Sequence, residues 1–168
     1  MLPVMFGGVL LNVTPDHLDR YDGFAGYAAS KARLFAMQDA DQFAVFGVGD
    51  SETRSVAERE LARHLPGKVQ SVDGADLLSL QPDWPTLQGP HNLQNAAVAV
   101  AIAEALGLTQ AQWAPALASF RGLPHRMERV AEAGGLLFIN DSKATNPAST
   151  APALAAFPPN PNKRVHWI

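Results

Sequence analysis

One short polar run, Asn140–Pro147, brings together side chains of types that do chemistry. It places a carboxylate, hydroxyls, an ammonium and amides in one turn, a set for which a packed core has no use. The apolar Leu136–Ile139 before it predicts a buried strand, and Ala148–Phe157 after it predicts a helix with Pro147 in its first turn. Polar groups between the carboxyl end of a strand and a helix N-terminus lie where α/β proteins bind phosphate-bearing ligands.

A purely structural role is the alternative for this run. Asn140, Asp141 and Thr145 are residue types that form Asx turns and helix caps. Such a role does not require the ammonium of Lys143, so the run favours a ligand site.

A second candidate segment, Asn12–Arg20, directly follows the predicted strand Val9–Val13. It gathers two carboxylates, the imidazole of His17 and a guanidinium at the carboxyl end of that strand. On spacing alone the favoured alternative is a solvated loop in which Asp16 caps a short helix.

An amide pair opens a later predicted helix, His91–Leu106. Asn92 and Asn95 lie three residues apart, so they share one helix face near its N-terminus. Two carboxamides can donate to and accept from a purine edge. Equally, Asn92 can serve as a helix cap.

Cationic residues complete the set of candidates. Lys31 lies among alanines in the predicted helix Phe24–Gln38, and by itself a lone helical lysine is typical of a solvated side chain. His125 and Arg126 follow a predicted linker, where a guanidinium can reach a phosphate; a surface ion pair with Glu128 is the alternative.

The elements that must position these residues alternate between strand and helix. Further strands are predicted at Phe43–Phe46, Lys68–Val72, Met127–Ala131 and Arg164–Ile168, and further helices at Ser55–His64 and Thr109–Phe120. Residues 73–88 contain two prolines and predict loop or short strands. The pattern predicts an α/β fold with a mostly parallel sheet and flanking helices. Near residue 122 the helical pattern gives way to a linker followed by strand patterns, which predicts a domain boundary that divides residues 1–122 from residues 123–168.

Composition excludes several classes of function. The 168 residues are 47% hydrophobic, enough for a packed core, and the formal net charge of −3 lacks the basic excess that nucleic-acid binding needs. There is no cysteine, so a metal must rest on oxygen and imidazole ligands. No apolar stretch approaches the roughly 20 residues that span a bilayer, so no membrane partner is expected.

Together, Leu123–Glu128 and the Ser142–Asn146 sequence Ser-Lys-Ala-Thr-Asn resemble the D-glutamate-adding branch of the Mur ligase family, which makes peptidoglycan precursors. The resemblance implies a partial central ATP-binding domain followed by the start of a Rossmann-like C-terminal domain. It also implies a cytoplasmic enzyme that uses ATP and Mg2+ to join D-glutamate to UDP-N-acetylmuramoyl-L-alanine through an acyl phosphate.

The resemblance assigns roles to the candidate residues. His17 becomes a ligand of Mg2+, and Lys31 becomes a carbamate whose oxygens also bind Mg2+. Asn92 and Asn95 contact adenine, Asp141 contacts the ribose or nucleotide, Arg126 lies at the γ-phosphate, and Lys143 lies near the reacting phosphate and acyl group. The remaining neighbours are His125, Ser142 and Thr145.

A phosphate-binding loop ending in Gly-Lys-Ser/Thr is absent from the 168 residues, because the Gly67-Lys68 pair is followed by Val69. The resemblance therefore predicts a fragment, about the middle third of a ligase, that does not turn over ATP alone. A sheet without its phosphate-loop strand is expected to expose an edge and to favour self-association. The alternatives are a non-catalytic nucleotide-binding or interaction module, and a sister ligase for another amino acid, folylpolyglutamate-type enzymes included.

Overall fold

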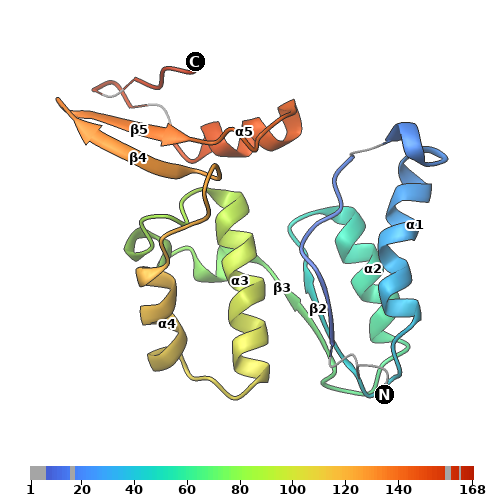
Figure 1. Cartoon of the computed structure of the whole chain (residues 1–168). Helices are drawn as coiled ribbons and strands as arrows, with labels where there is room; N and C mark the ends of the chain where they lie inside the picture. Colours follow the sequence, from blue (N-terminus) through green and yellow to red (C-terminus); the bar gives the residue numbers. More distant parts are fainter. Residues whose placement is uncertain (1–6, 16–17, 158–159, 163) are drawn as a thin grey trace. The chain divides into compact units, whose positions relative to one another are not determined.

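The computed structural model of the chain describes residues 7–15, 18–157, 160–162 and 164–168. Its contacts form two compact units, which are described separately (Figure 1). Unit 1 comprises Met1–Asp76 and Gln94–Leu108, and unit 2 comprises Leu77–Leu93 and Thr109–Ile168. A domain boundary near residue 122 stays a prediction.

Unit 1 is built on a parallel sheet. Its strands are β1 (Gly7–Leu10), β2 (Phe43–Gly47) and β3 (Val69–Val72), in the order β1-β2-β3. Both strand pairs are parallel, so each connection crosses over through a helix. The crossover helices are α1 (Gly23–Ala36), which follows the short 3-10 helix η1 (Leu18–Arg20), and α2 (Ser51–Leu61). The predicted α/β class with a parallel sheet is confirmed.

Helices cover both faces of this sheet. Because side chains alternate along a strand, Ala44 and Phe46 of β2 face one way and Val45 the other. Ala44 and Phe46 share a core cluster with residues of α1 and α2, whereas Val45 packs with Val98 and Ala101 of α3 (Pro90–Ala105). All three strand residues are fully buried. Burial on both faces explains why this strand is a continuous apolar run.

The side chain of Gln94, on α3, is hydrogen-bonded to the end of β3. Its amide nitrogen donates to the carbonyl of Val72 and its oxygen accepts from the N–H of Gly74, both at 3.0 Å. A Cβ added at Gly47 or Gly49 would lie 2.9 Å from this carboxamide. Gly47, the last residue of β2, and Gly49 therefore leave the space that Gln94 occupies.

Unit 2 contains a hairpin and short helices. Its elements are the 3-10 helix η3 (Gln81–Asp83), the first turn of α3, α4 (Gln110–Ser119), β4 (Glu128–Ala133), β5 (Leu136–Asn140) and α5 (Pro147–Ala155). Strands β4 and β5 pair antiparallel, and Gly134 and Gly135 turn the chain with φ of 58° and 76°. The predicted helix after the polar run is confirmed, with Pro147 as its first residue.

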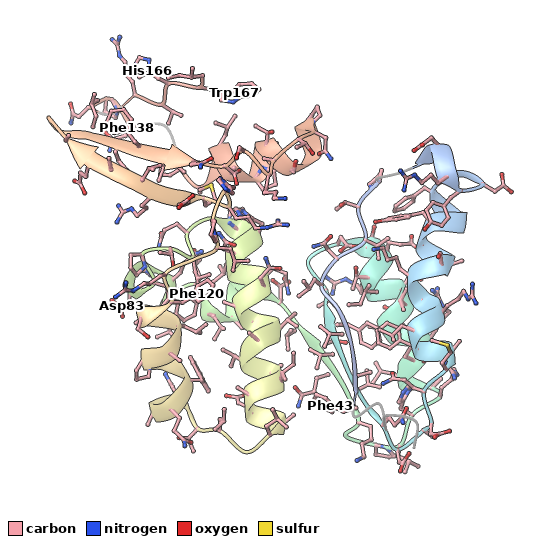
Figure 2. All side chains as sticks on the ribbon, in the orientation of Figure 1. Phe43, Asp83, Phe120, Phe138, His166 and Trp167 are labelled. Atoms are coloured by element: carbon pink, nitrogen blue, oxygen red, sulfur yellow. The ribbon has the colours of Figure 1, made fainter. Side chains whose placement is uncertain are left out.

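Two expectations are wrong. Leu136–Ile139 is a strand but not a buried one: Leu136 is 58% exposed and Phe138 48%, because within the described residues β5 pairs with β4 alone (Figure 2). Residues 164–168 form no strand, because no backbone in the described part of the chain hydrogen-bonds to their N–H and C=O groups. Trp167, in this segment, is 77% exposed. Residues 73–88, for which loop or short strands were expected, hold no strand; the 3-10 helices η2 (Gly74–Leu77) and η3 lie there, joined by irregular chain.

Candidate functional site

Two of the motifs predicted from the sequence meet in unit 2. The N–H of Met127 donates to the Asp141 carboxylate at 3.0 Å, and the N–H of Lys143 donates to the carbonyl of His125 at 3.1 Å. The amide nitrogen of Asn140 lies 2.9 Å from Nδ1 of His125. The turn before β4 and the loop after β5 are therefore joined through backbone and side chain alike.

The turn before β4 has an unusual backbone. His125 and Met127 have φ of 63° and 49°, in the left-handed region that side chains rarely adopt. The Glu128 carboxylate accepts from the N–H of His125 at 2.9 Å and from the Asn140 amide at 3.3 Å. These partners hold the strained turn in place, and strain of this kind concentrates at ligand-binding and catalytic sites. Nδ1 of His125 also lies 4.0 Å from the Glu128 carboxylate. Of the two basic residues, His125 therefore lies beside Glu128, and no ion pair between Glu128 and Arg126 is found.

Two cations extend from the joined segments. Arg126 lies on the turn and Lys143 on the loop, and both side chains are exposed. Among the described residues, neither forms an ion pair with a carboxylate. A guanidinium and an ammonium carried by adjacent segments suit an anionic ligand such as a phosphate.

The structural alternative for the polar run accounts for two of its residues. Asn140 Oδ1 accepts from the N–H of Ser142 at 3.2 Å, which makes an Asx turn. Asn146 caps α5, because its side chain accepts from the N–H of Ser149 at 2.8 Å. The cap is Asn146 and not Thr145, whose side chain is exposed. Lys143 takes no part in either feature.

The amide pair lies on α3. The helix begins at Pro90, so Asn92 is inside the first turn and does not cap it. The Asn92 amide donates to the carbonyl of Gln88 at 3.1 Å, and Asn95 lies one turn further along, half-buried. An adenine contact by either side chain stays a prediction.

His91, beside this pair, was given no role from the sequence. Its ring is half-buried, and burial lowers its pKa, opposed by the negative charge of Asp141 and by a hydrogen bond to the backbone of Pro152. Nδ1 is buried and has no partner among the described residues.

The predicted magnesium ligands belong to unit 1 or lie outside the description. His17 is outside the described residues. Lys31, on α1, is exposed, and its Nζ is 5.3 Å from the centroid of the Tyr27 ring. The ring face favours the charged ammonium. In the described part of the chain, no group of three or more His, Asp or Glu side chains is arranged to hold a metal ion.

Asp50 is a second residue that sequence reasoning missed. It caps α2 by accepting from the N–H of Thr53 at 2.7 Å, and its other oxygen accepts from the Thr53 hydroxyl at 2.7 Å and from the N–H of Val13 at 3.2 Å. It thereby holds the start of the Asn12–Arg20 segment to α2. The signal was an aspartate before a helix, hidden because the helix was expected to begin at Ser55 and not at Ser51.

None of the helices in the described part of the chain is long and apolar enough to cross a membrane.

Comparison with known proteins finds a matching family model and similar proteins that agree with it. Residues 4–76 match the Mur ligase middle domain. A protein of Novosphingobium aromaticivorans named UDP-N-acetylmuramoylalanine--D-glutamate ligase is 66% identical over 95% of this chain and 34% of its own length. A protein of the same name from Sphingopyxis alaskensis is 54% identical over 95% of this chain and 36% of its own length.

The fold has a solved counterpart. A crystal structure of MurF from Acinetobacter baumannii superposes with a TM-score of 0.70 at 23% identity, covering 90% of this chain and 37% of that one. The chain spans about a third of the length of the curated relatives it matches. With the parallel sheet and its crossover helices, these matches establish that the chain belongs to the Mur ligase family.

Proposed function

We propose that the chain is part of a cytoplasmic, ATP-dependent ligase that joins D-glutamate to UDP-N-acetylmuramoyl-L-alanine in peptidoglycan synthesis. The observation that carries this proposal is the similarity, over 95% of the chain, to proteins named for that activity. The exposed Arg126 and Lys143 on the joined turn and loop supply the charge that such a reaction requires.

The chemistry is activation followed by displacement. The substrate carboxylate attacks the γ-phosphorus of ATP, which gives an acyl phosphate and ADP, and the amine of D-glutamate then displaces phosphate to form the amide. Positioning and neutralisation of negative charge provide most of the acceleration in such transfers. We assign Arg126 to the γ-phosphate and Lys143 to the phosphate and acyl group, with His125, Ser142 and Thr145 as neighbours.

The nucleotide contacts come from helix α3 and the loop after β5. Asn92 and Asn95 are assigned to adenine, and Asp141 to the ribose. One Asp141 oxygen already accepts from Met127. The other oxygen is therefore the one assigned to a ribose hydroxyl, and the bond to Met127 orients it.

Magnesium, when bound, would neutralise phosphate charge and bind the incoming carboxylate. We assign His17 and a carbamylated Lys31 to it, because Mg2+ prefers oxygen ligands and a carbamate supplies them where an ammonium would repel the ion. The contact of Lys31 with Tyr27 favours the unmodified, charged lysine. Carbamylation thus competes with that contact. Intact mass measured under CO2 tests the modification as a gain of one CO2.

The test uses the protein of the complete reading frame that contains these residues. With UDP-N-acetylmuramoyl-L-alanine and ATP supplied, ADP release should depend on D-glutamate and not on other amino acids. Arg126→Ala should lower kcat/KM about 100-fold or more, the scale expected for loss of a charge-stabilising donor. The control Arg129→Ala, an exposed arginine on β4, should stay close to wild type.

Other outcomes point to the alternatives. Dependence on a different amino acid identifies a sister ligase, and nucleotide binding without ADP release identifies a binding module. We further propose that residues 1–168 alone do not turn over ATP, because they contain no Gly-Lys-Ser/Thr loop. Phosphate release by the purified 168-residue chain, well above background, would contradict this.

A further inference from the structure

A short segment of unit 2, residues 81–89, contains the 3-10 helix η3 and leads into α3. Figure 2 labels Asp83, the last residue of η3. The segment is closely packed, since Trp84 is 1% exposed and Gln81 is 8% exposed. Gly89 ends it with φ of 87°, a conformation that glycine adopts without strain. The approach to the helix is therefore an ordered one, as it must be to position a side chain on α3.

The side chains of Gln81 and Gln88 cross-link this segment as a glutamine brace. The Gln81 amide donates to the carbonyls of Leu87 and Gly89, both at 2.8 Å. The Gln88 amide donates to the carbonyls of Gln81 at 2.9 Å and Trp84 at 2.8 Å. A primary amide has two N–H donors, so both amides have all their donors in use. Each end of the segment is thereby bonded to a side chain from the other end.

The glutamine brace ends at the start of α3. The Gly89 carbonyl accepts from the Gln81 amide and also from the N–H of Leu93, at 3.1 Å, in the first turn of the helix. The Gln88 carbonyl accepts from the carboxamide of Asn92 at 3.1 Å. Because the side chain of Gln88 is bonded within the segment, the carbonyl of the same residue has little freedom to turn away from Asn92.

The bond to Gln88 also determines which way round the Asn92 carboxamide lies. Its nitrogen can donate to the carbonyl, whereas its oxygen in the same place would bring two acceptors together. One N–H of Asn92 is thus in use, and no other hydrogen bond of this carboxamide is found among the described residues. Its oxygen and its second N–H remain for a ligand.

We propose that Gln81 and Gln88 are positioning residues that hold the Gln88 carbonyl, and through it the Asn92 carboxamide, in the orientation that selects adenine. The inference rests on the proposed function, in which Asn92 contacts the base of ATP. In this orientation the oxygen accepts from the 6-amino group of adenine and the free N–H donates to the adjacent ring nitrogen, a pairing that asparagine makes with adenine. Hypoxanthine carries a carbonyl in place of the amino group, and that carbonyl would face the Asn92 oxygen. Neither glutamine contacts the nucleotide itself.

The first experiment measures selectivity for the base in the protein of the complete reading frame. ADP and IDP are the probes, because their bases differ at the 6 position and neither carries a γ-phosphate to transfer. In titration calorimetry, wild type should bind ADP about tenfold or more tightly than IDP. Gln88→Met keeps a side chain of similar length without the N–H donors, and should lower this ratio about threefold or more. Gln81→Met should lower it in the same direction.

A double-mutant cycle with Asn92→Ala separates positioning from a general loss of structure. Asn92→Ala should itself bring the ratio close to equality. Adding Gln88→Met should then change the ratio less than about twofold, because the carboxamide on which Gln88 acts is gone. An equal effect of Gln88→Met with and without Asn92 would overturn the proposal, as would a ratio that Asn92→Ala leaves unchanged.

The matched control is Gln112→Met, because Gln112 is also a hydrogen-bonded glutamine of unit 2. Its side chain accepts from the N–H of Thr109 at 2.9 Å, at the start of α4. The substitution should leave the ratio within about twofold of wild type. An unchanged ratio in Gln88→Met, or an equal fall in this control, would overturn the proposal.

The second experiment measures the glutamine brace itself by hydrogen exchange in the same protein without nucleotide. The Leu93 amide donates to the Gly89 carbonyl, which Gln81→Met deprives of its other partner. The Leu93 amide should therefore exchange about tenfold faster in Gln81→Met, the scale expected for lost buried hydrogen bonds, and at the wild-type rate in Gln112→Met. Equal rates in wild type and Gln81→Met would overturn the proposal.

The proposed function can fail separately. If wild type shows no D-glutamate-dependent ADP release, but the binding ratios and the exchange rates are as expected, the ligase activity is refuted and the positioning of Asn92 stands. If ADP release depends on D-glutamate and the ratios do not change, the positioning is refuted and the ligase activity stands.

Discussion

Replacing Asp50 with alanine tests how unit 1 holds the segment that follows β1. In the wild-type chain one carboxylate accepts three hydrogen bonds: from the N–H and the hydroxyl of Thr53, each at 2.7 Å, and from the N–H of Val13 at 3.2 Å. The substitution removes all three acceptors at once. It leaves the apolar contacts of α2 with the sheet in place.

The expected cost follows from the burial of the donors. Loss of a helix N-cap costs about 1 kcal/mol. Val13 is 3% exposed and Thr53 is fully buried, so water cannot readily replace the acceptor. A buried donor left without a partner costs roughly 1–3 kcal/mol. Because the Thr53 hydroxyl can rotate toward another acceptor, we expect the total loss to be about 3 kcal/mol.

Native-state hydrogen exchange followed by mass spectrometry is the assay, because it reports on unit 1 peptide by peptide. In Asp50→Ala, peptides of β1 and α2 should open with a free energy lower by about 3 kcal/mol. Asp50→Asn retains one acceptor oxygen and should lose about half as much. The control Asp41→Ala removes an exposed carboxylate of the same unit and should change the opening free energy by less than about 0.5 kcal/mol. A loss below about 1 kcal/mol in Asp50→Ala, or a loss equal to the control, would refute the reasoning.

Three further predictions concern Gln94, Asn146 and His91. Gln94→Leu keeps the volume but removes the bonds to Val72 and Gly74, so the unfolding free energy in urea should fall by about 1–3 kcal/mol; no change would mean that water replaces the carboxamide. Asn146→Ala removes the cap of α5 and should cost about 1 kcal/mol, seen as faster amide exchange in the first turn of that helix. Burial lowers the pKa of His91 below 6.5, so below about pH 6.5 the unfolded chain binds a proton that the folded chain resists. The unfolding free energy should therefore fall as pH drops from 6.5 through the lowered pKa, and His91→Gln should lack this part of the pH dependence; equal pH profiles would contradict it.

Local patterns in the sequence were sufficient for most elements. The apolar run at Phe43–Gly47 predicts the central strand because both of its faces are buried, and Pro147 predicts the first turn of α5 because its fixed φ suits that position. The resemblance carried by Leu123–Glu128 and Ser142–Asn146 predicted the family that the comparisons show. In each case the deciding information lies within a few residues.

Burial at the hairpin and at the C-terminal segment could not be predicted in this way. The apolar run around Phe138 is typical of a buried strand, yet Phe138 is exposed. Burial depends on which segments pack over β5. Residues 164–168 have the alternation of a strand but form none. A strand exists only where another backbone pairs with it, and a local pattern does not contain that partner.

The sequence by itself therefore determined the order of strands and helices as far as α5, the polar run at Asn140–Pro147 and the family to which the chain is similar. Only the tertiary structure revealed that Met127 bonds to Asp141, that Val13 bonds to Asp50, and that Gln94 bonds to the end of β3. The first two contacts join residues 14 and 37 positions apart in the chain. Helical and strand periodicities describe neighbours along one element, whereas hydrogen bonds of this range depend on how the elements pack in three dimensions.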